Sequence, residues 1–138
     1  MLTAFSTPAH RGRTRILLVT SALLAVGAGI VGIDDNPPGL LLAFISAGVF
    51  VTSFTHPWHS AARYRRLAFA SVLVFGVATV LHNLFWALGT IPDLPSLARM
   101  TMNGLSIVFF FLAILVCPAA FLVGVGGGVW AWRRSGRG

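Results

Sequence analysis

The chain has 138 residues, of which 57% are hydrophobic and only 9% are charged. This length allows one domain, and the composition excludes an ordinary soluble core, because soluble domains carry about 25% charged residues. The formal net charge is +7, and all ten basic residues are arginines. The arginines flank apolar stretches and form no continuous basic face. We therefore expect the bilayer, with its anionic lipid headgroups, as their partner, and no nucleic acid.

Two apolar stretches near the start predict a first helical hairpin. Residues 16–33 follow three arginines and are too long for the apolar region of a signal peptide, so we interpret them as a membrane helix. The break over residues 34–38, Asp-Asp-Asn-Pro-Pro, places Asn36 as the cap of a second helix over residues 37–54. Because the link is so short, the two helices should pack antiparallel. The first helix has a small-residue side that lets another helix come close: Ser21, Ala25, Ala28, Gly29 and Gly32.

Residues 67–88 predict a third membrane helix. Its length would be about 33 Å at about 1.5 Å per residue, against a hydrocarbon core of about 30 Å. On a helical wheel, aliphatic residues occupy one side, which we expect to face lipid. The opposite side should face protein and contains Ser71, Phe75, Ala78, Thr79, His82 and Trp86, with Asn83 beside them.

The last apolar stretch is too long for one crossing, because residues 96–132 would form about 55 Å of helix. We expect residues 97–103 to lie at the outer interface and residues 104–132 to cross the membrane, with a kink near Pro118. Gly124 and Gly128 have the GxxxG spacing of a close helix contact. The predicted fold class is an all-α membrane protein, a four-transmembrane-helix bundle made of two antiparallel helical hairpins.

The distribution of arginines predicts the orientation. The N-terminal tail, the middle link and the C-terminal tail hold three each, whereas the other two links hold only Arg99. By the positive-inside rule both termini are cytoplasmic. Arginine without lysine, together with many alanines and glycines, favours a GC-rich bacterial source and a multi-pass location in the cell (inner) membrane. The arginines expected to contact lipid headgroups are Arg63, Arg65, Arg66, Arg133 and Arg134.

A polar cluster is predicted toward the outer side of the membrane. His82 lies about two thirds of the way across, near the level of the turn that holds Asp34 and Asp35. Because an ionisable residue inside a membrane helix needs a partner, His82, Asn83, Asp34, Asp35 and Trp86 are candidates for binding a ligand or an ion. An alternative for His82 and Asn83 is hydrogen bonding between helices. The two aspartates could instead interact with the dipole of the helix that follows them.

Motifs for metals, cofactors and enzymes are weak or missing. His56 and His59 could share a metal ion, but two ligands are fewer than a zinc site normally shows. His82 has no histidine at its level on another helix to form a haem pair, so we expect no cofactor and no metal. The chain also lacks the hydrolase, metalloprotease and phosphate-loop motifs, so we expect no enzyme.

Two functional hypotheses follow. The first is a non-enzymatic structural or partner-binding membrane component, which packs against a second copy or another membrane protein through its small-residue faces. The alternative is a small transporter or channel for a proton, an ion or a small polar solute, with the polar cluster around His82 as its site.

Overall fold

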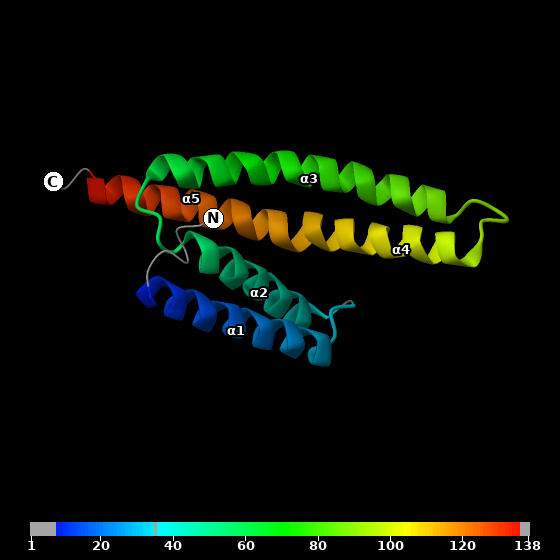
Figure 1. Ribbon diagram of the computed structural model, residues 1–138, viewed down its shortest axis with the longest axis horizontal. Helices are drawn as coiled ribbons and strands as arrows, with labels where there is room; N and C mark the ends of the chain where they lie inside the picture. The colour runs from blue at the N-terminus through cyan, green and yellow to red at the C-terminus, as the bar shows by residue number, and fades with distance from the viewer. Residues whose placement is uncertain (1–7, 35, 136–138) are drawn as a thin grey trace.

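The computed structural model describes residues 8–34 and 36–135. It is helical throughout the described elements, and four helices are long and apolar enough to cross a membrane (Figure 1). The predicted class is confirmed: the chain is a small, multi-pass, all-α membrane protein. The helices are α1 (Pro8–Val31), α2 (Pro37–Thr55), α3 (Ala61–Gly89) and a continuous fourth helix made of α4 (Ser96–Phe111), the π-helical segment η2 (Leu112–Val116) and α5 (Cys117–Ser135).

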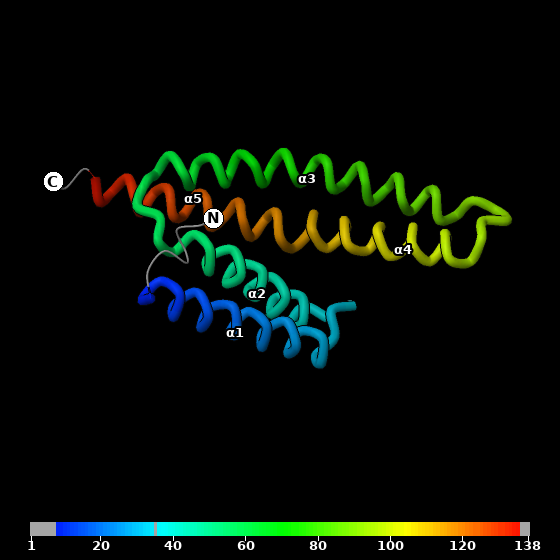
Figure 2. Tube along the Cα trace, in the orientation of Figure 1, coloured from blue at the N-terminus to red at the C-terminus, as the bar shows by residue number. Residues whose placement is uncertain are grey.

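The helices form two antiparallel hairpins, as predicted. In the first hairpin α1 packs against α2, and in the second α3 packs against the fourth helix. The hairpins meet where α2 contacts α5 and η2. Among the described helices α1 packs along α2 alone, and α3 packs along the fourth helix, with one hydrogen bond from Tyr64 to the last residue of α2, Thr55. The bundle is therefore open, with α1, α2, the fourth helix and α3 following one another side by side (Figures 1 and 2).

The interior consists of small side chains, whereas the large aliphatic ones point outward. Ile30 is 81% exposed, and the predicted aliphatic sides of α1 and α3 face away from the protein. Lipid tails are as apolar as leucine, so large side chains gain little by being buried between membrane helices, while small ones permit close packing. The buried hydrophobic residues are Ala28, Ala47, Tyr64, Ala78, Ala113, Cys117, Ala119, Ala120 and Ala131.

The turn of the first hairpin depends on two glycines. Gly32 has a φ of +87°, a left-handed conformation that glycine adopts without strain. Gly39 lies against the carbonyl group of Gly32, where a Cβ atom would overlap the oxygen. Asn36 occupies the N-cap position of α2, as predicted, but its side-chain amide donates to the carbonyl oxygen of Val31, 2.7 Å away, and makes no cap hydrogen bond. Asn36 thus closes the end of α1.

Residues 97–103 form no separate segment, because they belong to α4, which packs on α3. Their place at the membrane interface stays a prediction. The fourth helix is about 60 Å long at about 1.5 Å per residue. The break predicted near Pro118 takes the form of η2, in which the N–H of Cys117 donates to the carbonyl oxygen of Leu112, five residues earlier. Because proline has no N–H and its ring crowds the carbonyl four residues back, widening the preceding turn accommodates it.

Candidate functional site

His82 on α3 hydrogen-bonds to Ser106 on α4. Its Nδ1 atom is 3.0 Å from the carbonyl oxygen of Ser106 and 3.0 Å from Ser106 Oγ. Ser106 Oγ also donates to the carbonyl oxygen of His82 at 3.3 Å, and the Phe110 ring centroid lies 5.2 Å from that of the imidazole. With the proton on Nδ1, the imidazole donates to the Ser106 carbonyl, so the second hairpin itself satisfies this nitrogen.

The structure does not bring the other described members of the predicted polar cluster to His82. Asn83 donates to the carbonyl oxygen of Thr79 in its own helix at 2.8 Å, and Trp86 is 60% exposed. Asp34 is exposed in the turn after α1, and Asp35 lies outside the described residues. In Figure 1, α4 lies between that turn and the outer part of α3. The number of residues along α3 predicts the depth of His82, and the helical wheel predicts its side of the helix. Neither predicts its neighbour, which comes from α4.

The protein-facing side of α3 is narrower than predicted. Ser71 and Ala78 are buried, as expected, but Phe75 and Trp86 are exposed. The reason is that α3 packs along one neighbour, the fourth helix, which covers only part of the circumference of α3. The remainder of α3 is open to the surroundings.

A second polar arrangement links α1 to the end of α2. His56 Nε2 lies 3.0 Å from Thr14 Oγ1, and Thr14 Oγ1 donates to the carbonyl oxygen of Ser53 at 3.2 Å. The ring of His10 lies 5.6 Å from that of His56. Burial lowers the pKa of His56 below its ordinary value of 6.5, and the positive charges of Arg13 and His10 lower it further. The neutral imidazole is therefore favoured here.

His10 is the residue that the sequence analysis missed in this arrangement. The spacing in sequence suggested His59 as the partner of His56, but His59 is exposed and the ring beside His56 comes from α1. The available signal was the four-residue spacing of His10 and Thr14, which places both on one face of a helix. Within the part of the chain that the structure describes, no three His, Cys, Asp or Glu residues group as metal ligands.

The arginines predicted to contact headgroups lie at one end of the molecule. Antiparallel packing brings the start of α1, the link between α2 and α3, and the end of α5 together there, and we call this the arginine-rich end (Figure 1). The guanidinium carbon of Arg134 lies 4.1 Å from the ring centroid of Trp130, a cation–π contact. The exposed side chains at this end include Arg63, Arg65, Arg66, Arg133 and Arg134.

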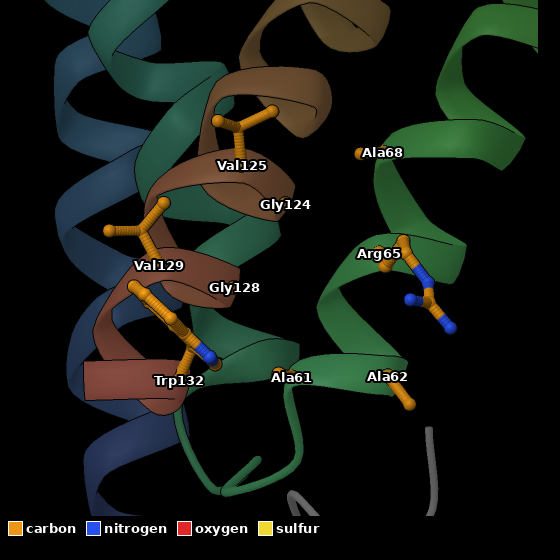
Figure 3. Close-up of a pocket in the computed structure, with 9 residues that line it drawn as sticks. All are labelled: Ala61, Ala62, Arg65, Ala68, Gly124, Val125, Gly128, Val129 and Trp132. Atoms are coloured by element: carbon orange, nitrogen blue, oxygen red, sulfur yellow. The ribbon is translucent and has the colours of Figure 1, made fainter. Parts of the chain in front are cut away.

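Three open grooves cross the described surface, and all are lined mainly by apolar groups. Two lie between α3 and α5, with volumes of about 390 Å³ and about 330 Å³. The first of them has Arg65 and Trp132 at its rim (Figure 3). The third, of about 370 Å³, lies between the two hairpins, and we call it the hairpin groove. Its lining is Ser21, Ala25, Ala28, Gly29, Ile33, Ala43, Ser46, Ala47, Phe50, Phe111, Leu115 and Val116.

Two kinds of glycine can be distinguished around these grooves. A Cβ atom at Gly124 would lie 2.7 Å from the backbone nitrogen of Ala68, and one at Gly127 would overlap the Tyr64 ring. Of the predicted GxxxG pair, Gly124 therefore serves close packing of α5 on α3, whereas a Cβ atom at Gly128 would make only an ordinary contact, 3.6 Å from the Cβ atom of Tyr64. By contrast, a Cβ atom at Gly29 would meet nothing within 4 Å.

This geometry offers apolar surfaces and satisfied hydrogen bonds rather than an assembled polar site. Comparisons of the chain with protein-family models, with curated proteins and with solved structures found no match.

Proposed function

We propose that this protein is a non-enzymatic component of the cell membrane whose hairpin groove receives a membrane helix, and that the helix is α1 of a second copy. The arginine-rich end faces the cytoplasm in this proposal, because the positive-inside rule favours basic links on that side. The protein then acts through association and performs no chemical reaction.

The observation that supports this proposal is the open small-residue side of α1. Ala25 and Gly29, four residues apart, are exposed at the rim of the hairpin groove, although Ser21 and Ala28 on the neighbouring face are buried against α2. Because Gly29 has open space around its Cα atom, it performs no packing inside the chain. In a bilayer, association of helices depends on close approach at small residues, and Ala25-x-x-x-Gly29 has the required spacing.

A second copy fits this surface by symmetry. All copies insert in the same orientation, so two α1 helices that meet in the membrane are parallel. A twofold axis along the membrane normal then pairs the same patch on both copies, which closes the assembly as a dimer. Small-xxx-small motifs are known from such parallel crossings. The bulky rim residue Phe50 of each copy would flank the pair.

The transport hypothesis receives less support from the geometry. His82 is hydrogen-bonded within the second hairpin, because its partner Ser106 belongs to α4. The grooves described above are lined mainly by apolar groups, whereas a path for a polar solute or an ion needs polar groups or water along it.

Cysteine cross-linking in native membranes tests the proposed dimer. In a Cys117→Ala background, an Ala25→Cys variant should form a disulfide-linked dimer under mild oxidation. A Leu23→Cys variant is the matched control, because Leu23 is 68% exposed at similar depth on the other side of α1. Dimers from Ala25→Cys but not from Leu23→Cys support the proposal, whereas equal yields or no dimer from either variant exclude it.

A bulky residue in the groove provides an independent test. Gly29→Leu should convert the dimer to a monomer on native mass spectrometry. Gly27→Leu should remain dimeric, because position 27 points elsewhere on α1 and also has open space. If both variants behave alike, the groove is not the interface.

A further inference from the structure

Two neighbouring grooves lie one after the other along α3 and α5, as a channel in two parts on the second hairpin. On α3, positions 61, 65, 68, 72 and 75 line them, with the alternating spacings of four and three residues that define one helix face. On α5, positions 118, 121, 125, 128 and 132 follow the same pattern. We call this channel the α3–α5 groove. It shares no lining residue with the hairpin groove.

The groove has one charged end and is otherwise apolar. Arg65 lines it near the arginine-rich end, level with Gly128 and with its guanidinium directed away from α5, while Trp132, which is 69% exposed, lies level with Ala61 and Ala62 (Figure 3). The far end is lined by Phe75, Phe121 and Pro118 and contains no charged residue. The floor includes Ala68, whose side chain is a single methyl group, and Gly124, which has no side chain (Figure 3). A ligand that fits must therefore be an amphiphile with an anionic head and an apolar tail.

The length of the groove agrees with one leaflet of a bilayer. Fourteen residue steps along α3, from Ala61 to Phe75, correspond to about 21 Å. One leaflet contributes about 15 Å of hydrocarbon, and the headgroup region adds the remainder. Tryptophan and arginine are also the side chains that the headgroup boundary selects.

We propose that the α3–α5 groove binds one acyl chain of an anionic phospholipid, whose phosphate pairs with Arg65. The guanidinium forms charge-assisted hydrogen bonds to the phosphate oxygens. The chain lies along the apolar lining, and Trp132 packs against the region where chain and headgroup join. The other exposed arginines at this end act as a diffuse positive field around the site.

Native mass spectrometry of the full chain from nanodiscs tests this site. The probe is an equal mixture of phosphatidylglycerol and phosphatidylcholine, and the wild type should retain one phosphatidylglycerol molecule. Arg65→Gln should lower the preference for phosphatidylglycerol about fivefold. Arg66→Gln is the matched control with the same loss of charge, because Arg66 does not line the groove. Equal effects of the two substitutions would overturn the assignment of Arg65.

The acyl part is tested by filling the groove. Gly128→Leu places a side chain on the floor, and its Cβ atom would make an ordinary contact 3.6 Å from the Cβ atom of Tyr64. The Gly126→Leu control adds the same side chain where nothing lies within 4 Å. Gly128→Leu should abolish retention, and Gly126→Leu should preserve it. If both variants retained phosphatidylglycerol, or if inorganic phosphate released the lipid from the wild type, the proposed acyl-chain site would be overturned.

Discussion

The two hairpins share an antiparallel topology but hold their helices together with different groups. In the first, Ser21 Oγ donates to the carbonyl oxygen of Ser46 at 3.0 Å, and Ser46 Oγ donates to that of Ser21 at 2.8 Å. In the half of the second hairpin away from the arginine-rich end, the Phe85 and Phe109 rings stack with centroids 5.6 Å apart and an interplanar angle of 7°. The first hairpin is joined by serine hydroxyls, whereas this half of the second combines stacked rings with the hydrogen bonds between His82 and Ser106.

The half of the second hairpin at the arginine-rich end resembles the first hairpin more than its own far half. Gly124 lies against the backbone of Ala68, and Gly127 lies against the ring of Tyr64. The Tyr64 hydroxyl donates to the carbonyl oxygen of Thr55 at 3.0 Å, which joins α3 to the end of α2. Close packing thus occurs where the hairpins meet at the arginine-rich end. Adding one methyl group should be most damaging in these close-packed regions.

The largest effect should come from Gly39→Ala. The added Cβ atom overlaps the carbonyl oxygen of Gly32, so the turn between α1 and α2 must shift. We expect a loss of about 3 kcal/mol in the free energy of unfolding, the upper part of the range for overpacking. Thermal unfolding in detergent measures it. Gly48→Ala, which meets nothing within 4 Å, should cause no loss.

Gly124→Ala should be next, with a loss of about 2 kcal/mol. Its Cβ atom would lie 2.7 Å from the Ala68 nitrogen and 2.9 Å from the Tyr64 carbonyl oxygen, both backbone atoms. Gly126→Ala, two positions away in open space, is the control and should be neutral or stabilising because alanine is the better helix former. If Gly124→Ala and Gly126→Ala changed the free energy of unfolding equally, the close contact between α3 and α5 would be refuted.

His82→Ala should lower the free energy of unfolding by about 1 kcal/mol, because it removes the hydrogen bonds to Ser106 and the contact with Phe110. The loss should appear in unfolding experiments without any change in bound species on native mass spectrometry. If the wild type carries an ion that this variant lacks, His82 is a ligand and the transport hypothesis becomes the stronger one.

The interaction energy between Ser21 and Ser46 should be smaller than the loss expected for His82→Ala. A double-mutant cycle with Ser21→Ala and Ser46→Ala should give an interaction energy of about 0.6 kcal/mol, the average for hydrogen bonds between membrane helices. The cycle reports the contact between the two Oγ atoms, 3.2 Å apart, because the bonds to the backbone carbonyl oxygens are each lost in their own single variant. A coupling near zero would mean that the two hydroxyl groups act independently.

The smallest effect should be a pH dependence at the arginine-rich end. Because the pKa of His56 is lowered in the fold, the unfolded state binds more protons near that pKa, so stability rises with pH. The stability linked to neutral His56 is fully present above pH 6.5 and is lost as the pH falls through the lowered pKa of the folded state. The unfolding temperature should therefore drop on acidification. His56→Gln should remove part of the drop, whereas His59→Gln should retain it.

Several features of the fold were predictable from local pattern. The length of the apolar runs predicts four membrane helices, and the Asp-Asp-Asn-Pro-Pro break predicts the first turn and the start of α2 at Pro37. The lack of an N–H on Pro118 predicts a disturbance of the fourth helix, and η2 is that disturbance. Each of these depends on chemistry within a few residues.

The candidate sites were less predictable, because they depend on which helices become neighbours. The partner of His82 is Ser106, the ring beside His56 belongs to His10, and Gly124 rather than Gly29 is occupied by packing within the chain. None of these pairings follows from the periodicity of one helix.

The sequence by itself determined the number of the helices, their outward aliphatic sides and the gathering of the arginines at one end. Those properties follow from the transfer of apolar groups into a bilayer and from chain connectivity. Only the tertiary structure decided that α1 contacts just α2, that residues 97–103 continue the fourth helix, and that the grooves remain open. The physical reason is that lipid solvates large apolar side chains as well as another helix does, so a hydrophobic pattern does not encode which helices pack together.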